Sequence, residues 1–63
     1  MRFKKGEKIK TEGKIFECFV SDEELACFGV VVEIEDGKSV DFDDTFVVSN
    51  IKGFDDGFKY EKI

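Results

Sequence analysis

The sequence contains no histidine, no proline and no tryptophan, and it has only two cysteines. Histidine is the most frequent general base in enzymes and a frequent metal ligand, so its absence argues against catalysis. Two thiols without histidine do not make a zinc site, and two cysteines do not make a disulfide framework. We therefore expect a non-enzymatic protein with no cofactor and no bound metal.

Long hydrophobic runs are also missing. No stretch approaches the roughly 20 apolar residues of a membrane span, and the opening MRFKKGEKIK contains no apolar run of the kind found in signal peptides. We therefore expect a cytoplasmic protein that does not enter a membrane, with reduced cysteines. Pairing Val20 with Leu25 across strands would place Cys18 opposite Cys27, and we interpret these two as small buried hydrophobic residues in preference to a redox pair.

The chain of 63 residues forms one small domain, residues 1–63, near the lower size at which a protein folds without disulfides or metals. Large side chains must then supply most of the buried area. The sequence has eight phenylalanines and one tyrosine, and each aromatic side chain can bury roughly 150–250 Å². We expect these residues to form the core.

The net charge of −5 is unevenly distributed. Residues 1–14 contain six basic and two acidic side chains, a net charge of +4, whereas the remainder contains four basic and thirteen acidic side chains, a net charge of −9. Such asymmetry bears on binding partners and solubility, and it says little about the fold.

Residues 28–42, FGVVVEIEDGKSVDF, carry the strongest structural pattern. Phe28, Val30, Val32 and Ile34 alternate with other residues, which is the period of two expected for a strand with one buried face. The β-branched side chains favour the same structure. The segment therefore predicts a strand followed by a return strand.

The loop between these two strands is predicted to contain three residues, 35–37, with Gly37 in the left-handed conformation of a β-bulge. A two-residue turn of Asp36 and Gly37 would set apolar residues against polar ones, and such a register is disfavoured. The three-residue loop keeps one face apolar. Its predicted pairs are Val32 with Val40 and Val30 with Phe42.

Shorter strand patterns, separated by tight turns, occur along the rest of the chain. Ser21 and Glu24 have the spacing of a helix capping box, which predicts at most one short helical turn. A second acidic loop at residues 55–57 predicts a hairpin that pairs Phe54 with Phe58. Because no long helix is indicated, the sequence predicts an all-β protein, a small antiparallel barrel of five to six strands. The further strands are expected at residues 8–11, 14–20, 46–51 and 58–63, with a polar break at 43–45.

The opening segment at residues 3–9, FKKGEKI, reads as a basic turn followed by a strand. In a five-stranded chain of this length, it resembles the SH3-like small barrels, including the Tudor and KOW groups. The resemblance covers most of the chain at the level of architecture and implies a closed barrel. The aromatic binding positions of those groups do not map onto specific residues here, so the resemblance assigns no site residue and no function.

The strand at residues 14–20 has apolar residues on both faces, but a barrel of this size has one interior. We expect Ile15 and Phe19 to face the core and a terminal segment to cover the other face, leaving at least Leu25 or Val31 exposed as a contact surface. The expected second face consists of Phe16, Cys18, Val20, Leu25, Cys27 and Val31. The candidate cover is Phe3 with Ile9, or Tyr60 with Ile63.

Acidic side chains accumulate on the 28–42 hairpin and its flanks. In the predicted register Glu33 and Asp41 point away from the core on one side, which gives an anionic ribbon. We therefore expect a protein-binding module, an accessory or inhibitory protein that docks on a basic partner surface or imitates nucleic-acid phosphate; solvated surface and homodimer formation are alternatives. The expected acidic contacts are Glu33, Glu35, Asp36, Asp41, Asp43 and Asp44, and the apolar contacts are Phe16, Leu25 and Val31.

The alternative function is nucleic-acid binding through the basic N-terminal segment. Phe3 and Phe16 lie among its lysines, and aromatic side chains beside basic strands stack on single-stranded bases. The acidic remainder would repel phosphate, and lysine-rich edge strands also protect sheets from aggregation. The residues concerned are Lys4, Lys5, Lys8, Lys10 and Lys14.

The paired aspartates admit a further reading as a cation site or as catalytic carboxylates. Their spacing matches no EF-hand loop, and no basic or hydroxyl partner is placed beside them by the sequence. Acidic pairs next to turns are usually solvated, so we interpret these residues as surface. They are Asp41, Asp43, Asp44, Asp55 and Asp56.

Overall fold

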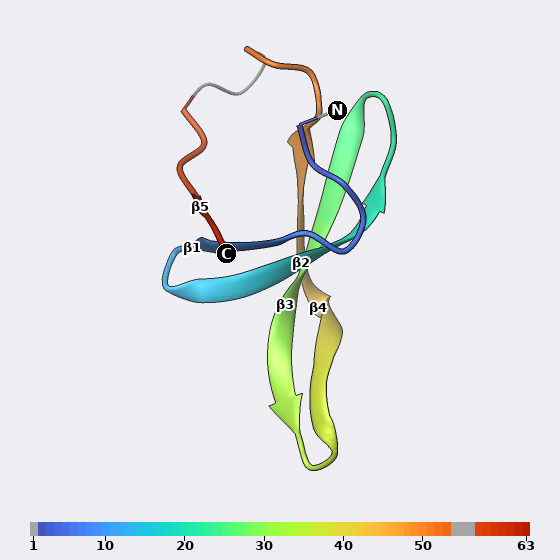
Figure 1. Ribbon diagram of the computed structural model, residues 1–63, viewed down its shortest axis with the longest axis vertical. Coiled ribbons are helices and arrows are strands. Elements are labelled where there is room, and N and C mark those ends of the chain that lie inside the picture. Colours follow the sequence, from blue (N-terminus) through green and yellow to red (C-terminus); the bar gives the residue numbers. More distant parts are fainter. Residues whose placement is uncertain (1, 54–56) are drawn as a thin grey trace.

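The computed structural model describes residues 2–53 and 57–63, and these form one antiparallel sheet (Figure 1). The order of strands in the sheet is β4-β3-β2-β1-β5. No helix occurs in the described residues, which confirms the all-β prediction. Over the same residues the end strands β4 and β5 do not pair, so the sheet is not closed into a barrel. The strands are β1 (Lys8–Thr11), β2 (Lys14–Ser21), β3 (Leu25–Ile34), β4 (Gly37–Ser49) and β5 (Glu61–Lys62).

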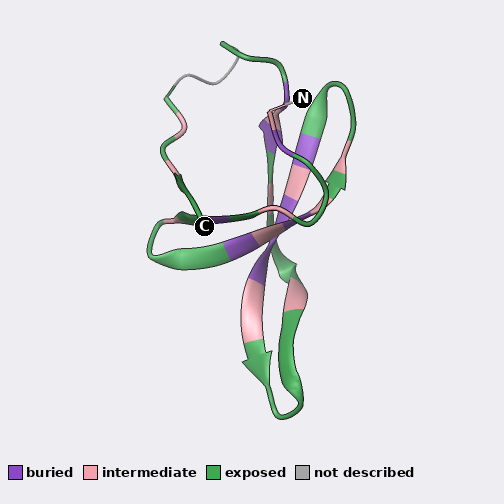
Figure 2. Cartoon of the chain, viewed as in Figure 1, coloured by how far each residue is buried: buried purple, intermediate pink, exposed green. Residues whose placement is uncertain are grey.

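Strands β1 and β2 run across the long strands β3 and β4, and the buried residues gather where they cross (Figures 1 and 2). One end of the β3–β4 hairpin projects from this body, and its tip is exposed (Figure 2). The molecule is accordingly elongated, with dimensions of 39 × 22 × 20 Å. The core consists of Phe3, Ile9, Phe16, Cys18, Ala26, Phe28, Val30 and Val48.

Strand β2 turns the opposite face from the predicted one toward the core. Phe16 is 4% exposed and Cys18 is fully buried, whereas Ile15 is 36% exposed. The prediction that Phe16 is a surface contact is therefore wrong. A strand that is apolar on both faces contains no signal for which face is inside; here Phe3 and Ile9, both fully buried, cover the Phe16 side. These two residues provide the cover that the sequence predicted.

The connection between β2 and β3 contains no helical turn. Oδ1 of Asp22 accepts hydrogen bonds from the N–H groups of Leu25 and Glu24, each at 2.8 Å, and the Asp22 N–H donates to the Leu25 carbonyl. These bonds, the one from Leu25 most, lower the pKa of the Asp22 carboxyl. The predicted capping box is therefore replaced by a turn that the aspartate side chain holds.

The two cysteines do not face each other across β2 and β3. Val20 pairs with Cys27 and Cys18 pairs with Phe28, so Phe19 is an extra residue in β2. The predicted pairing of Cys18 with Cys27 assumed a regular ladder, and this one-residue bulge shifts it.

The β3–β4 loop has two residues, Glu35 and Asp36, because Ile34 pairs with Gly37. The predicted three-residue loop is therefore wrong by one residue, although the φ angle of Gly37 is +138°, positive as predicted. The predicted register requires one apolar face along the whole hairpin. Beyond the body, however, the hairpin buries neither face fully, so side-chain burial does not fix the register there.

A bulge in β4 separates the pairing of β3 with β4 in the body from their pairing in the projecting part of the hairpin. Gly29 pairs with Thr45 and Val30 with Asp41, so residues 42–44 have no partner on β3. Strand β4 thus continues through the predicted polar break. A Cβ on Gly29 would lie 2.5 Å from Cγ1 of Val40, which explains why only glycine fits where the bulge closes over β3.

The C-terminal segment returns to the body and pairs with β1. Ile9 is opposite Lys62 in this pairing, and the Tyr60 ring lies 5.1 Å from the Phe3 ring between centroids. The strand predicted from residue 58 is thus shorter, because β5 contains only Glu61 and Lys62. The predicted hairpin between Phe54 and Phe58 lies partly outside the described residues.

A buried polar network around Asn50 joins three parts of the chain. Asn50 is 5% exposed; its Oδ1 accepts from the Phe3 N–H at 2.9 Å, and its Nδ2 donates to Ser21 Oγ at 2.7 Å and to the Asp22 carbonyl at 2.6 Å. Ser21 Oγ donates in turn to the Phe3 carbonyl at 2.7 Å. The network ties the N-terminal segment, the β2–β3 turn and the end of β4 together.

We predict that Asn50→Ala lowers the free energy of unfolding by about 1–3 kcal/mol, because it leaves the buried Phe3 N–H without its acceptor and removes the bonds to Ser21 and Asp22. Urea denaturation would measure the change. The control is Ile51→Ala at the neighbouring position, which is 44% exposed and should cost less than about 1 kcal/mol. Equal losses in the two variants would contradict the role of the network.

The β1–β2 turn strains one residue. Thr11 pairs with Lys14, and the two residues between them have positive φ angles, 53° for Glu12 and 77° for Gly13. Both central residues of a type I′ turn take positive φ, and asparagine tolerates this conformation better than glutamate does.

We therefore predict that Glu12→Asn raises the free energy of unfolding by about 0.5–1 kcal/mol. Thermal and urea denaturation would measure the gain. The same change at Glu23, an exposed residue without positive φ, should give no such gain. A midpoint at or below that of the parent protein would show that the turn is not strained.

Candidate functional site

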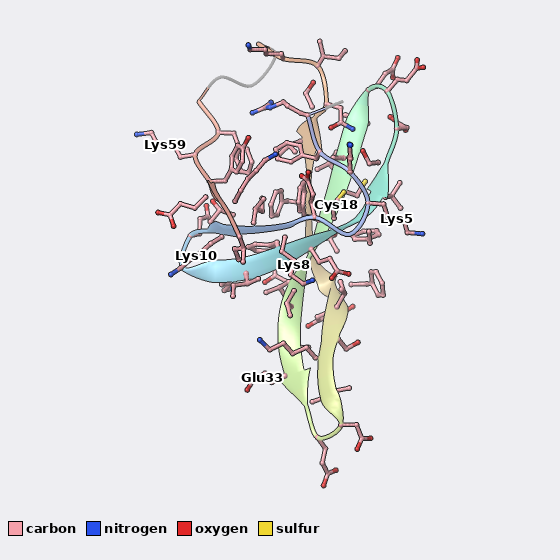
Figure 3. The ribbon with its side chains drawn as sticks, viewed as in Figure 1. Lys5, Lys8, Lys10, Cys18, Glu33 and Lys59 are labelled. Carbon is pink, nitrogen blue, oxygen red and sulfur yellow. The ribbon has the colours of Figure 1, made fainter. Side chains whose placement is uncertain are left out.

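The six acidic residues predicted to contact a partner all lie on the β3–β4 hairpin. Residues 31–41 project from the body, and we call this part the arm (Figure 1). Glu35 and Asp36 form its tip, and Glu33 points sideways from it (Figure 3). The arm contains four acidic residues and one basic residue, Lys38, so its net charge is −3.

Glu33 and Asp41 lie on opposite faces of the hairpin, contrary to the prediction. Glu33 is paired with Lys38, and Asp41 with Val30. Because side chains alternate along a strand, the shifted register moves Asp41 to the other face. The Asp41 carboxylate also accepts a hydrogen bond from the Asp43 N–H at 2.9 Å. Instead of one anionic ribbon, the arm carries acidic groups at its tip and on both faces.

Both edges of the arm are open in the described residues. The pairing of β2 with β3 ends at Phe16 and Val30, so β3 has no neighbour on that side beyond Val30. Strand β4 is the last strand of the sheet. Open strand edges present unpaired backbone groups that can bind another chain. The sequence contains no signal for these open edges, because alternation identifies the faces of a strand and not its neighbours.

The three predicted apolar contacts do not form one surface. Phe16 belongs to the core, Leu25 is 47% exposed and Val31 is half-buried. Leu25 is the first residue of β3 and Val31 lies six residues further along it, which corresponds to about 20 Å along a strand. The expected exposure of Leu25 is confirmed, but Leu25 lies beside the β2–β3 turn and only Val31 lies on the arm.

Other apolar side chains are exposed on the outer face of the sheet. Val20, Cys27 and Val47 form one cross-strand row, with Val20 47% and Val47 54% exposed. Beside this row the Phe19 and Phe42 rings meet edge to face at 5.0 Å between centroids. Phe42 was predicted to be buried and is 63% exposed, because it stands in the β4 bulge.

The five candidate nucleic-acid lysines do not form one continuous basic surface. Lys5 and Lys10 point toward opposite sides of the body (Figure 3). Lys8 forms an ion pair with Glu17 at 3.3 Å and Lys14 one with Asp44 at 3.2 Å. Lys10 and Lys4 are exposed, and Lys10 is paired across strands with Glu61. Acidic residues of β2, β4 and β5 therefore interrupt the basic segment.

Aromatic side chains for base stacking are not available in this segment. Phe3 is fully buried and Phe16 is 4% exposed. The Phe3 ring packs edge to face against Phe28 at 5.1 Å between centroids, and Phe16 packs in the same way against Phe46 at 4.7 Å. Both rings are therefore packed in the core and are not accessible to a base.

Cys18 and Cys27 are free thiols in different environments. Cys18 is fully buried and its Sγ donates to the Val20 carbonyl at 3.3 Å, whereas Cys27 is half-buried. Burial raises the pKa of the Cys18 thiol, so less thiolate is present at neutral pH. The thiolate is the reactive form, and Cys18 is therefore expected to be inert in the folded protein.

We predict that a thiol reagent such as Ellman's reagent modifies Cys27 in the folded protein and reaches Cys18 only after unfolding. Absorbance against time should give one fast and one slow phase, and Cys27→Ala should remove the fast one. The melting temperature should not respond to a reducing agent. Two equally fast thiols, or a large drop in melting temperature on reduction, would contradict the assignment of packed, unbridged cysteines.

Comparison with known proteins adds no assignment to this geometry. In the part of the chain that the structure describes, no three His, Cys, Asp or Glu side chains gather as a metal site, and no helix could span a membrane. The function therefore has to be argued from the arm, the open strand edges and their charge. No protein-family model, curated protein or solved structure matches the chain.

Proposed function

We propose that this chain is a non-enzymatic protein-binding module whose arm docks on a basic surface of another protein. The observation that carries the proposal is the projection of the arm from the body with four acidic side chains and one lysine. A two-stranded ribbon is marginally stable in water unless another surface packs against it. The arm is therefore well suited to gain its packing from a partner.

Charged and apolar side chains of the arm would make different contributions to binding. The acidic tip of Glu35 and Asp36 would steer a basic partner and set its orientation. Val31 and Val40 face each other across the arm and are half-buried, and Ile34 is 53% exposed near the tip. These side chains would supply the apolar contact that charge alone does not provide.

An accessory or inhibitory role in the cytoplasm belongs to the same proposal. So does a relation to the SH3-like small barrels, which five antiparallel strands in one strongly bent sheet support at the level of architecture. Nucleic-acid binding has less support, because the lysines are interleaved with acidic residues and the neighbouring aromatic rings are buried. We therefore advance the protein-binding function alone.

We predict that Glu35→Gln with Asp36→Asn weakens partner binding about three- to thirtyfold, because two charges that steer and orient the partner are removed. The tagged protein would capture partners from a nuclease-treated native lysate, followed by mass spectrometry and affinity measurement with the purified partner at two salt concentrations. We expect the affinity for the partner to fall more steeply with salt in the parent protein than in the double variant.

The matched control is Glu23→Gln with Glu24→Gln, which removes two exposed acidic groups at the turn that joins β2 to β3. This variant should bind as the parent protein does. Equal weakening by the two pairs of substitutions would argue against docking through the arm. Recovery of nucleic acid alone, before nuclease treatment, would overturn the proposed function.

A further inference from the structure

A groove of about 350 Å³ lies at the open side of the sheet. One wall consists of five consecutive residues, 44–48, which belong to β4. Side chains of consecutive strand residues point alternately to opposite faces. Five consecutive residues can line the same wall only through their backbone, so this wall is the backbone edge of β4. That edge has no neighbouring strand in the described residues.

The opposite wall is formed near the other end of the sheet. It consists of Thr11 and Glu12 at the β1–β2 turn and of Phe58 in the C-terminal segment. Thr11 Oγ1 donates to the Lys59 carbonyl at 2.8 Å, which attaches the C-terminal segment to β1. The groove thus occupies the gap between β4 and the β1 and β5 side, where closure of the sheet would occur.

Aromatic side chains give the groove an apolar floor. Phe16, Phe46 and Phe58 all line it. The Phe46 ring lies 4.7 Å from Phe16 and 5.8 Å from Phe58 between centroids. Phe46 and Phe58 are only half-buried, so part of their surface is available to an incoming apolar side chain.

The charged residues at the groove are acidic. Glu12 and Asp44 line it, and Lys14 reaches Asp44 from outside the lining at 3.2 Å. This ion pair is exposed, so a competing cation can replace it at little cost. An occupant with basic side chains would therefore meet complementary charge.

We propose that the groove binds an extended, basic segment of a partner protein, which pairs with residues 45–48 of β4 as a sixth strand and closes the sheet. Backbone hydrogen bonds to the β4 edge provide affinity in this mode, and alternate side chains provide specificity. In the partner segment, the side chains opposite Phe46 and Val48 are apolar, because these two residues of β4 face the core. The side chains between them in the partner segment are lysine or arginine. This site is separate from the arm, and binding to it does not require the arm.

A second copy of the chain is a poor occupant. Its basic strand β1 is already paired on both sides, with β2 and with β5. Its longest open edge in the described residues is β4 itself. Antiparallel pairing of two β4 edges over their full length, residues 37–49, would be centred on Asp43 and would bring Asp41, Asp43 and Asp44 of both copies together. Like charges across strands are destabilising.

The test uses a blocked seven-residue peptide that alternates valine and lysine, at concentrations where diffusion measurements find it monomeric. NMR titration of the protein amides should place binding at residues 44–48 and Phe58. Hydrogen exchange of those amides in 45–48 that face away from β3 should slow at least tenfold at saturation. A peptide with glutamate in place of lysine should bind at least tenfold more weakly.

Two further peptides, with the same side chains but with N-methyl groups on every second amide, one in each of the two possible frames, separate strand pairing from side-chain contact. Both methylation frames remove donors, and the frame that faces β4 should abolish binding. The protein variant Glu12→Gln with Asp44→Asn should bind the parent peptide at least threefold more weakly. The control Glu23→Gln with Glu24→Gln and the arm variant Glu35→Gln with Asp36→Asn should both bind it unchanged.

Several outcomes would overturn the proposal. They are equal binding of both N-methylated peptides and the parent peptide, amide shifts confined to the arm, and protection of residues 45–48 in the free protein together with a dimer in sedimentation. The last result would identify a second copy as the occupant. A failure of the arm variant to affect partner capture, with normal peptide binding in the groove, would count against the proposed function only.

Discussion

The side chain of Asn50 forms the interaction on which the rest of the structure depends. Its amide is hydrogen-bonded to Phe3, Ser21 and the β2–β3 turn, and it is buried. A small domain has few apolar contacts to spare, so a polar group that aligns three segments fixes where Phe3 enters the core. With Phe3 in place, the Phe16 face of β2 is covered, and apolar residues on the opposite face of the sheet, such as Val20 and Val47, are left exposed.

Two bulges determine how the sheet bends and what it exposes. Phe19 is the extra residue in β2, and residues 42–44 are extra in β4. Bulges increase local twist and turn side chains toward a different face. As a result Phe42 meets Phe19 on the outer surface, and the ladder beyond the bulge is shifted, which separates Glu33 from Asp41. The arm and the groove both begin at this position, one on each side of the β4 bulge.

Strand β4 contributes acidic residues to both proposed binding sites, Asp41 to the arm and Asp44 to the groove. It is a strand of thirteen residues at the end of the sheet, and a long open edge carries a risk of aggregation. The aspartates at 41, 43 and 44 and the bulge itself oppose pairing with identical edges. In the proposed binding mode the same charges favour a strand of opposite charge, so protection from self-association and the proposed selection of a basic partner would have one cause.

The sequence by itself determined the all-β class, the strand-rich segments, the aromatic core and the positive φ of Gly37, and it named Phe3 with Ile9 as one of two candidate covers for the second face of β2. These follow from local alternation, turn chemistry and composition, which need no knowledge of distant residues. Only the tertiary structure decided which face of β2 is inside, the registers of Cys18 and Val32, the open side of the sheet and the role of Asn50. Each of these depends on contacts between segments far apart in the chain, and a strand that is apolar on both faces satisfies local patterning in either orientation.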